Sequence, residues 1–473
     1  MVGGINMIDL SIKKALKQAL LSNKLCVYIG SGFSIPCGLP GWKELMRPLA
    51  ESIGLDIEKE TEYMQVAQYY VNEKNRYELN EIIRDKFNLK SKITEISENH
   101  KLLTSLSLPE VWTTNYDNAL ENSYNELKVD FDLKVKKEDL SYGINKKLQI
   151  YKVHGSYNNP DECIVTQEDY EDLYDKKKYF IEALKVSLIQ KQFLFVGFSF
   201  KDPDIRFILA ELRRAEINKR NHYWITYDNP KWTKYEKNKQ NIFIKDLEKN
   251  YGIRPIRISN WNELTDLLKD LNKYKNQKSV FISGALAETS PEQGQFLETL
   301  SSSLIKNELS IVSGYGLGVG SQIITGALTE IYENHKISSD YLKLHPFPQN
   351  VSDPATRKEL WKKYRTDMCL EAGFQIIVFG NKKDPSDETK RINSPGIQEE
   401  FEIAVDNQLF IIPVGSTGYK AEEIWDLMNK DLEKYGYTSK KLKKYFGELK
   451  SIGYNSPKLI ETINNIIREV CNE

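Results

Sequence analysis

The sequence predicts an α/β protein with two Rossmann-like domains, each built on a parallel sheet. Short β-rich segments alternate with longer helical patterns, and several of these segments are apolar on both faces. Strands of this kind are typical of parallel sheets that helices cover on both sides. A lysine- and asparagine-rich stretch at 269–278 interrupts the alternation, and a new strand follows it directly. We therefore expect one domain over residues 1–275 and a second over residues 276–473.

The composition is that of a globular protein without a membrane span or a basic surface. Of the 473 residues, 40% are hydrophobic and 28% are charged, and the formal net charge is -1. Because lysines alternate with acidic residues, we expect no nucleic-acid partner. The N-terminus indicates an amphipathic helix rather than a signal peptide, so we expect a cytoplasmic protein without membrane contact. Met1 and Met7 both remain candidates for the native start.

The cysteine pattern indicates neither a zinc site nor a disulfide framework. The sequence has 5 cysteines, an odd number, and none of them form a CxxC pair. Structural zinc sites and disulfide frameworks need paired, regularly spaced cysteines. We therefore expect no metal and a reducing compartment.

The first half contains six expected strands with helical patterns between them. In open α/β sheets, ligands bind beyond the carboxyl ends of the strands, so the residues that follow each strand matter most. The six segments are 25–30, 109–114, 148–153, 193–198, 223–228 and 253–258.

Polar clusters follow four of these strands. GSGFS (30–34) is a glycine loop whose amides suit a diphosphate, and TTNYD (113–117), VHGS (153–156) and GFSFKD (197–202) follow the other three strands. Each cluster also has an ordinary explanation: a strand-to-helix turn, a turn histidine, or a helix cap at Asn115, Asp202 or Asp204. Their coincidence at four carboxyl ends favours one shared cleft.

In this order the four motifs resemble the sirtuin series GAGxS, TQNxD, HG and GxS, over roughly residues 20–260. Sirtuins cleave the nicotinamide–ribose bond of NAD, so the resemblance implies NAD as the substrate. It implies that Asn115 and His154 are catalytic, with His154 as the base. It further implies NAD contacts from Gly30, Ser31, Gly32, Ser34, Asp117 and Ser199.

The chemistry of NAD cleavage asks for such residues. Loss of nicotinamide leaves an oxocarbenium-like ribose, and the Asn115 amide can position a water molecule without neutralising that charge. An imidazole has an unperturbed pKa of about 6.5, so His154 can accept a proton from water or from a ribose hydroxyl.

The sequence departs from protein-deacylating sirtuins, which carry two zinc-binding CxxC pairs beside the peptide groove. Thr114 replaces the glutamine of TQN, and the asparagine that meets the adenosine ribose has only Thr226 or Asp228 in its place. Water is then the simpler acceptor, and we expect an NAD glycohydrolase that releases ADP-ribose and nicotinamide. The alternatives are an NAD-dependent protein deacylase and a non-catalytic nucleotide sensor or scaffold.

The second half repeats the pattern of apolar strands followed by glycines. Its expected strands are 279–285, 309–318, 341–347, 374–381 and 409–416. Its strongest nucleotide-loop signal is SGYGLGVGS (313–321), which leads into an apolar helix. We expect this loop to bind a phosphate through its backbone amides, although glycines here also suit close packing of a helix on a strand. The residues concerned are Gly314, Gly316, Leu317 and Gly318.

Charged residues further along can complete this second site. Arg365 and Lys382 can pair with a diphosphate, and Glu400 can accept a hydrogen bond from a ribose hydroxyl. Lys383 and Glu399 are adjacent alternatives. For any one of these residues, a surface salt link is the simpler explanation.

This half resembles the SLOG family of nucleotide-sensing domains. A sirtuin-like half followed by a SLOG half, with FGNKK, EEF and IIPVGSTGY, is similar to the effector family of the Thoeris antiphage system. The resemblance implies that a cyclic ADP-ribose isomer, made by a TIR-domain partner, binds the SLOG domain and activates NAD hydrolysis. It implies assembly as tetramers or filaments, and it matches Arg365, Lys382 and Glu400 to the family's ligand contacts. It does not specify the isomer.

Overall fold

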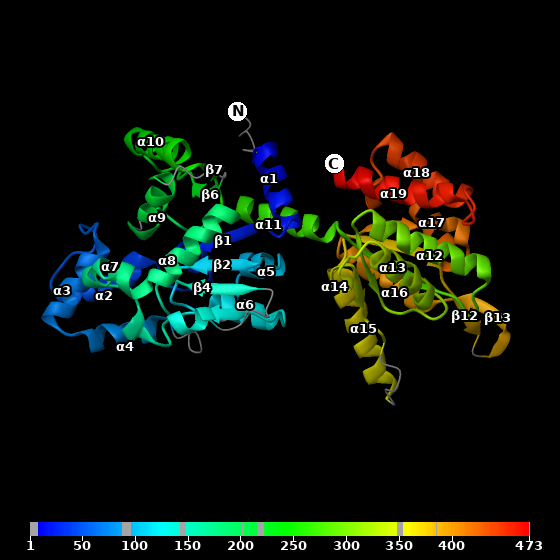
Figure 1. Cartoon of the computed structure of the whole chain (residues 1–473), viewed down its shortest axis with the longest axis horizontal. Helices are drawn as coiled ribbons and strands as arrows, with labels where there is room; N and C mark the ends of the chain where they lie inside the picture. Colours follow the sequence, from blue (N-terminus) through cyan, green and yellow to red (C-terminus); the bar gives the residue numbers. More distant parts are fainter. Residues whose placement is uncertain are drawn as a thin grey trace. The chain divides into compact units, whose positions relative to one another are not determined.

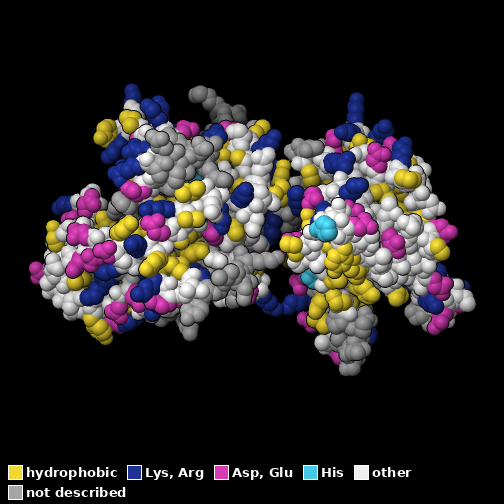
Figure 2. Space-filling view, in the orientation of Figure 1, with side chains coloured by type: hydrophobic (Ala, Val, Ile, Leu, Met, Phe, Trp, Pro, Cys, Tyr) yellow, Lys and Arg dark blue, Asp and Glu magenta, His cyan; other side chains and the backbone are white. Residues whose placement is uncertain are grey.

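The chain forms two compact units, residues 1–272 and 273–473, each with its own parallel sheet (Figure 1). No helix within the described ranges is long and apolar enough to cross a membrane. On the face seen in Figure 2, basic and acidic side chains are interspersed over each unit. The structure is a computed structural model that describes residues 8–87, 96–141, 148–200, 203–214, 222–347, 353–384 and 386–472.

The sheet of the first unit has seven strands in the order β3-β4-β2-β1-β5-β6-β7, and every neighbouring pair is parallel. This confirms the predicted α/β class, and the six expected strands are present together with the short β3, which was not expected. The strands are β1 (Leu25–Ile29), β2 (Glu110–Thr113), β3 (Asp132–Lys134), β4 (Gln149–Lys152), β5 (Gln192–Val196), β6 (His222–Tyr227) and β7 (Ile253–Ile258).

Helices cover both faces of this sheet because its strands are apolar on both sides. Along β1 the side chains alternate: Val27 and Ile29 join one core cluster, and Cys26 and Tyr28 join the other. Side chains of α1 (Leu10–Leu21), α5 (Glu98–Ser105), α6 (Ala119–Glu126) and α11 (Asn262–Asn276) complete the first cluster. The second is completed by α8 (Leu173–Gln190), α9 (Pro203–Arg214) and α10 (Lys234–Tyr251).

A helical insertion between β1 and β2 has a core of its own. Its apolar faces pack with Tyr116, Cys163 and Val165 from the loops at the carboxyl edge of the sheet, and with Ala119 at the start of α6. The insertion therefore borders the edge where the predicted motifs lie. It contains α2 (Trp42–Ser52), α3 (Tyr63–Glu73) and α4 (Arg76–Phe87), and the short α7 (Gln167–Glu171) contacts α3.

The second unit has a five-stranded parallel sheet in the order β10-β9-β8-β11-β14, and an antiparallel hairpin of β12 and β13. The strands are β8 (Ser279–Ala285), β9 (Ser310–Ser313), β10 (Leu342–Leu344), β11 (Phe374–Phe379), β12 (Asn381–Asp384), β13 (Asp387–Asn393) and β14 (Phe410–Pro413). The helices are α12 (Pro291–Lys306), α13 (Gly320–Glu333), α14 (Ser338–Tyr341), α15 (Pro354–Leu370), α16 (Pro395–Asp406), α17 (Tyr419–Met428), α18 (Lys440–Ser451) and α19 (Pro457–Asn472).

Candidate functional site

Four adjacent strands bring the four sequence motifs to one edge of the first sheet. The strands β4, β2, β1 and β5 are neighbours in this order, and all run in the same direction. Their carboxyl ends therefore lie along one edge, as a ligand site in an open α/β sheet requires. Gly30, Asn115, His154 and Ser199 each follow one of these ends by one to three residues.

The glycine loop after β1 touches the loop after β5 through the backbone. Gly32 N donates to the Gly197 carbonyl at 3.1 Å, and Gly30 N donates to Val196 O at 3.0 Å. A Cβ on Gly30 would lie 2.4 Å from the Gly197 oxygen, and Gly197 itself has a φ of +64°. These glycines are thus required by a close approach between two loops, whatever they bind.

Asn115 joins the loops after β1 and β2. Its Nδ2 donates to Gly30 O at 3.3 Å and to Ser34 Oγ at 3.1 Å, and its backbone N donates to Thr113 Oγ1 at 3.0 Å. The side chain is 7% exposed, and its Oδ1 has no hydrogen-bond partner among the described residues. The amide is therefore fixed by its nitrogen and retains one oxygen that can accept a hydrogen bond.

The alternative explanation of Asn115 as a helix cap is wrong. The helix α6 starts at Ala119, with Asn118 in the N-cap position, and Asp117 Oδ1 accepts from Ala119 N at 2.9 Å. Of the other alternative caps, Asp202 lies outside the described residues, and Asp204 lies inside α9. The residues between β2 and α6 thus form a loop, and the side-chain amide of Asn115 does not cap the helix that follows.

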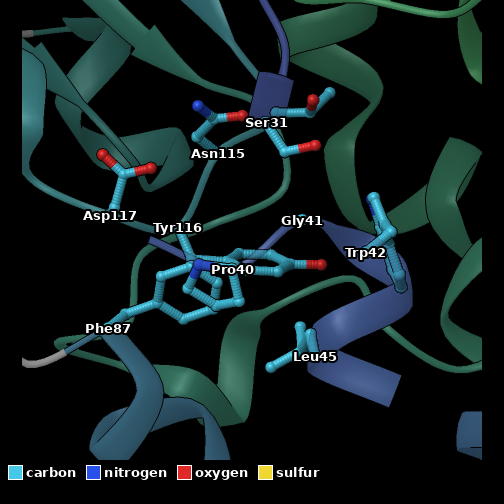
Figure 3. A pocket seen from close by; sticks show the side chains of 10 residues that line it. Ser31, Pro40, Gly41, Trp42, Leu45, Phe87, Asn115, Tyr116 and Asp117 are labelled. Carbon is cyan, nitrogen blue, oxygen red and sulfur yellow. The ribbon is translucent and has the colours of Figure 1, made fainter. Parts of the chain in front are cut away.

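A pocket of about 340 Å³, partly open to solvent, lies beside this loop (Figure 3). Ser31, Asn115 and Asp117 are the predicted site residues that line it. Figure 3 shows Ser31 and Asn115 on one side of the pocket and Phe87 and Leu45 on the other. The remaining lining residues are Pro40, Gly41, Trp42, Thr114 and Tyr116.

The apolar wall was not anticipated from the sequence. Trp42 and Leu45 come from α2 and Phe87 ends α4, so the helical insertion supplies this wall. Tyr116 packs edge-on against Phe87 and Trp42, with ring centroids 5.7 Å and 6.4 Å apart. The apolar and aromatic residues of GLPGW (38–42), shortly after the glycine loop, were a usable signal for Pro40 and Trp42, whereas Phe87 ends a mostly polar helix that carries no such signal.

His154 lies near this edge but outside the wall of the pocket. It is 1% exposed, its carbonyl accepts from Ile164 N at 3.1 Å, and its ring packs edge-on against Tyr170 at 5.5 Å. Gly30, Gly32, Ser34 and Ser199 also do not line the pocket. The structure thus brings part of the predicted site together.

The two residues considered for adenosine ribose are engaged elsewhere. Both oxygens of Asp228 accept from Arg257, at 2.8 Å and 3.0 Å, and Thr226 is buried and accepts from Gln240 at 3.0 Å. Neither residue lines the pocket.

A buried histidine lies under the glycine loop. The His100 ring packs on Phe33 with centroids 4.4 Å apart, and its Nδ1 is 2.8 Å from Ser97 Oγ. Burial lowers the pKa of His100 to about 4, although the negative charge of Asp117 opposes this shift. The imidazole is therefore neutral near pH 7.

In the second unit, the glycine loop after β9 packs tightly on the loop after β8. A Cβ on Gly316 would lie 2.3 Å from Gly284 O, and Gly318 has a φ of +68° beside Leu286 O. Leu317 O accepts from Leu286 N at 2.9 Å, while its side chain is 70% exposed. The packing role considered for these glycines is therefore present.

Arg365 and Glu400 form a buried pair rather than a surface salt link. Arg365 Nε lies 3.4 Å from Glu400 Oε1, Arg365 NH1 lies 2.7 Å from Glu399, and Ser283 Oγ donates to Glu400 at 2.6 Å. Arg365 is 8% exposed and Glu400 is 7% exposed. Burial raises the pKa of Glu400, while Ser283 and Arg365 lower it.

The lysines of the hairpin differ from each other. Lys382 on β12 forms no ion pair with any residue that the structure describes, whereas Lys383 lies 3.5 Å from Glu288. The remaining predicted contact, Gly314, lies outside this hairpin and packs against Phe347 and Met368. The structure thus joins Arg365 with Glu400 and shows no ion pair of Lys382 within the described ranges.

No cluster of His, Cys, Asp and Glu that could hold a metal ion occurs in the described ranges. The five cysteines are free, and four of them are buried. Burial raises the pKa of the Cys163 thiol to about 12.

Two family models match the chain. One, described as a SIR2-like domain, covers residues 109–256, and the other, the Sir2- and TIR-associating SLOG family, covers residues 263–470. The chain is 36% identical to NAD(+) hydrolase ThsA of Bacillus cereus (strain MSX-D12) over 98% of this chain and 99% of that protein. It is 37% identical to NAD(+) hydrolase ThsA of Acinetobacter baumannii (strain 532279) over 98% of both chains. The chain therefore belongs to the ThsA family, in which a SIR2-like domain precedes a SLOG domain.

Proposed function

We propose that this protein is an NAD glycohydrolase of antiphage defence, which cleaves NAD to nicotinamide and ADP-ribose. Four relatives carry the name NAD(+) hydrolase ThsA and are 32% to 37% identical over nearly the whole chain. The observation that carries the proposal is the Asn115 amide at the pocket, which is fixed by its nitrogen and whose oxygen has no hydrogen-bond partner among the residues that the structure describes. We assign NAD hydrolysis to the domain at residues 1–275 and signal binding to the domain at residues 276–473.

The pocket suits the reacting end of NAD. Its aromatic wall of Trp42, Phe87 and Tyr116 offers an apolar surface to a planar nicotinamide ring. Asn115 Oδ1 accepts a hydrogen bond from the attacking water or from a ribose hydroxyl. An amide orients these groups without placing a full charge beside the developing oxocarbenium ion. Of the other proposed NAD contacts, Asp117 and Ser31 also face this pocket.

We assign the role of general base to His154. Because His154 is 1% exposed and outside the pocket wall, this role requires the loop at 153–156 to move when the enzyme is active. Gly30, Gly32, Ser34 and Ser199 would contact NAD from the loops after β1 and β5. A buried base in the resting protein agrees with an enzyme that is switched on by a signal.

The signal that we propose is a cyclic ADP-ribose isomer made by a TIR-domain partner. Arg365 would pair with its diphosphate, Lys382 with a second phosphate oxygen, and Glu400 with a ribose hydroxyl. Backbone amides of the loop at 314–318 would complete the site. Because Glu399 and Glu400 already pair with Arg365, the diphosphate must compete with both carboxylates. The ligand activates only if it binds the active form more tightly.

We propose a cytoplasmic homotetramer or filament that interacts with the TIR-domain protein through the diffusing signal. Neither nucleic acid nor a membrane takes part, and NAD is a substrate that is cleaved without a metal.

The test is release of nicotinamide by the purified full-length protein, titrated with cyclic ADP-ribose isomers. We expect one isomer to raise the rate, and Asn115→Ala and His154→Ala to abolish it while the fold is retained. Absence of release under all conditions would favour a non-catalytic sensor. Transfer of an acyl group from an acyl-lysine peptide to ADP-ribose would instead identify a deacylase.

A further inference from the structure

Lys152 is a fully buried lysine in strand β4 of the first sheet. It is the last residue of β4, it lies two residues before His154, and its side chain is 0% exposed. Ile150, on the same face of β4, belongs to a core cluster with Leu120 and Tyr124 of α6. An ammonium group in such surroundings is strongly destabilising unless each of its N–H groups has an acceptor.

All the acceptors of Lys152 belong to the segment that follows Asn115. Its Nζ donates to the carbonyls of Tyr116, at 3.3 Å, and of Asp117, to Asn118 Oδ1 at 3.1 Å, and to Glu121 Oε1 at 2.8 Å. An ammonium has three N–H groups, so this segment occupies its full donor capacity. The side chain thus connects the strand that leads to His154 with the loop that carries Asn115 and Asp117.

The contacts determine the direction of two peptide groups. Because the carbonyls of Tyr116 and Asp117 point to Lys152, their peptide planes are fixed, and both side chains line the pocket. Glu121 lies in the first turn of α6, where a carboxylate is favoured, and it neutralises the buried ammonium. The pair therefore holds the loop between β2 and α6 in the shape that presents Asn115.

We infer that Lys152 is a positioning residue for the NAD cleavage proposed above, on which this inference rests. It acts through the loop at 115–118: it holds Asn115 and Asp117 in place relative to β4, the strand that leads to His154. Its loss then lowers kcat much more than it raises KM, because the reacting geometry depends on it more than NAD binding does.

A second buried lysine provides a matched control. Lys134, on the neighbouring strand β3, is 2% exposed, pairs with Asp132 at 2.6 Å and donates to Asp139 O. Neither Asp132 nor Asp139 lines the pocket. A role that is merely structural predicts similar losses for both lysines, whereas a positioning role predicts a loss of turnover for Lys152 alone.

The experiment compares Lys152→Met/Glu121→Gln with Lys134→Met in the full-length protein, at saturating activator. The double variant leaves no unpaired buried charge, and we expect its kcat to fall about 100-fold while KM changes less than about threefold. Lys134→Met should retain kcat even where its Tm falls. Hydrogen exchange should quicken at 114–122 in the double variant and stay unchanged at β6 and β7.

The milder variant Lys152→Gln/Glu121→Gln keeps an N–H donor in the core and replaces the first variant if that one does not fold. Its kcat should lie between those of the wild type and of the Met variant. Wild-type kcat in either folded double variant, or a loss that follows Tm equally in Lys134→Met, would overturn the role of Lys152. Absence of turnover in the wild type would instead refute the proposed function, and the role of Lys152 with it.

Discussion

The two units present their candidate ligand groups in opposite ways. In the first unit, Asn115 lines a pocket with an aromatic wall, and its buried amide oxygen has no hydrogen-bond partner among the described residues. In the second, Arg365 is already paired with Glu399 and Glu400. A neutral, preorganised group suits the cationic transition state that we propose for the first unit, whereas a paired cation suits the anion-responsive site that we propose for the second.

Substitution of Asn115 tests the first half of this comparison and should have the largest effect. Asn115→Ala removes the amide that joins the loops after β1 and β2, and we expect kcat to fall about 10²–10³-fold, as for loss of a preorganised polar group. Steady-state release of nicotinamide measures it. Asn122→Ala, an exposed asparagine of α6, is the control and should change nothing. Near-normal turnover in folded Asn115→Ala would refute the assignment.

The buried His100 tests whether the glycine loop rests on a neutral histidine. Its folded-state pKa of about 4 lies below the ordinary 6.5, so the unfolded chain binds a proton that the folded protein does not. The free energy of unfolding should therefore fall by up to about 3 kcal/mol as the pH drops from 6.5 to 4.

Urea unfolding across this pH window measures the effect. His100→Gln should remove that part of the slope, whereas His335→Gln, an exposed histidine, should keep it. An unchanged slope in His100→Gln would mean that another group accounts for the pH dependence.

Substitution of Arg365 tests the second half of the comparison. Arg365→Ala removes a charged contact to the proposed diphosphate, and we expect the activator concentration for half-maximal turnover to rise about 10- to 100-fold. Basal turnover should stay the same. Lys363→Ala, exposed on the same helix, is the control. An unchanged activation curve would remove Arg365 from the signal site.

The glycine contacts test a feature that both units share. A Cβ on Gly30 would lie 2.4 Å from Gly197 O, and one on Gly316 would lie 2.3 Å from Gly284 O. We expect Gly316→Ala to destabilise the protein by about 1–3 kcal/mol. Gly447→Ala, in α18 with no atom within 4 Å, should stabilise it by about 0.5–1 kcal/mol. Chemical denaturation distinguishes the two, and equal stability would contradict the close approach.

The strands and the shared edge could be predicted from the sequence because both signals are local. Apolar runs such as 25–29 identify buried strands, and polar residues that follow them mark the carboxyl ends. The order of β4, β2, β1 and β5 then brings the motifs together. The short β3 was missed because its three residues, Asp132–Lys134, are mostly polar.

The rest of the site depends on tertiary packing. Phe87 lies in the pocket wall because the helical insertion folds against Tyr116, and no local pattern specifies that contact. Lys152 looks like an ordinary lysine at the end of a strand until α6 covers it. Arg365 and Glu400 were predicted as separate ligand contacts, and only the fold of α15 and α16 reveals that they pair.

The most direct test of the account is activated turnover of NAD in ¹⁸O-labelled water, followed by mass spectrometry of the products. If a water molecule held at Asn115 attacks the ribose, ADP-ribose from the wild type will carry a single ¹⁸O at the anomeric carbon, and Asn115→Ala will yield almost no product. Labelled product from Asn115→Ala at the wild-type rate would contradict hydrolysis at this site.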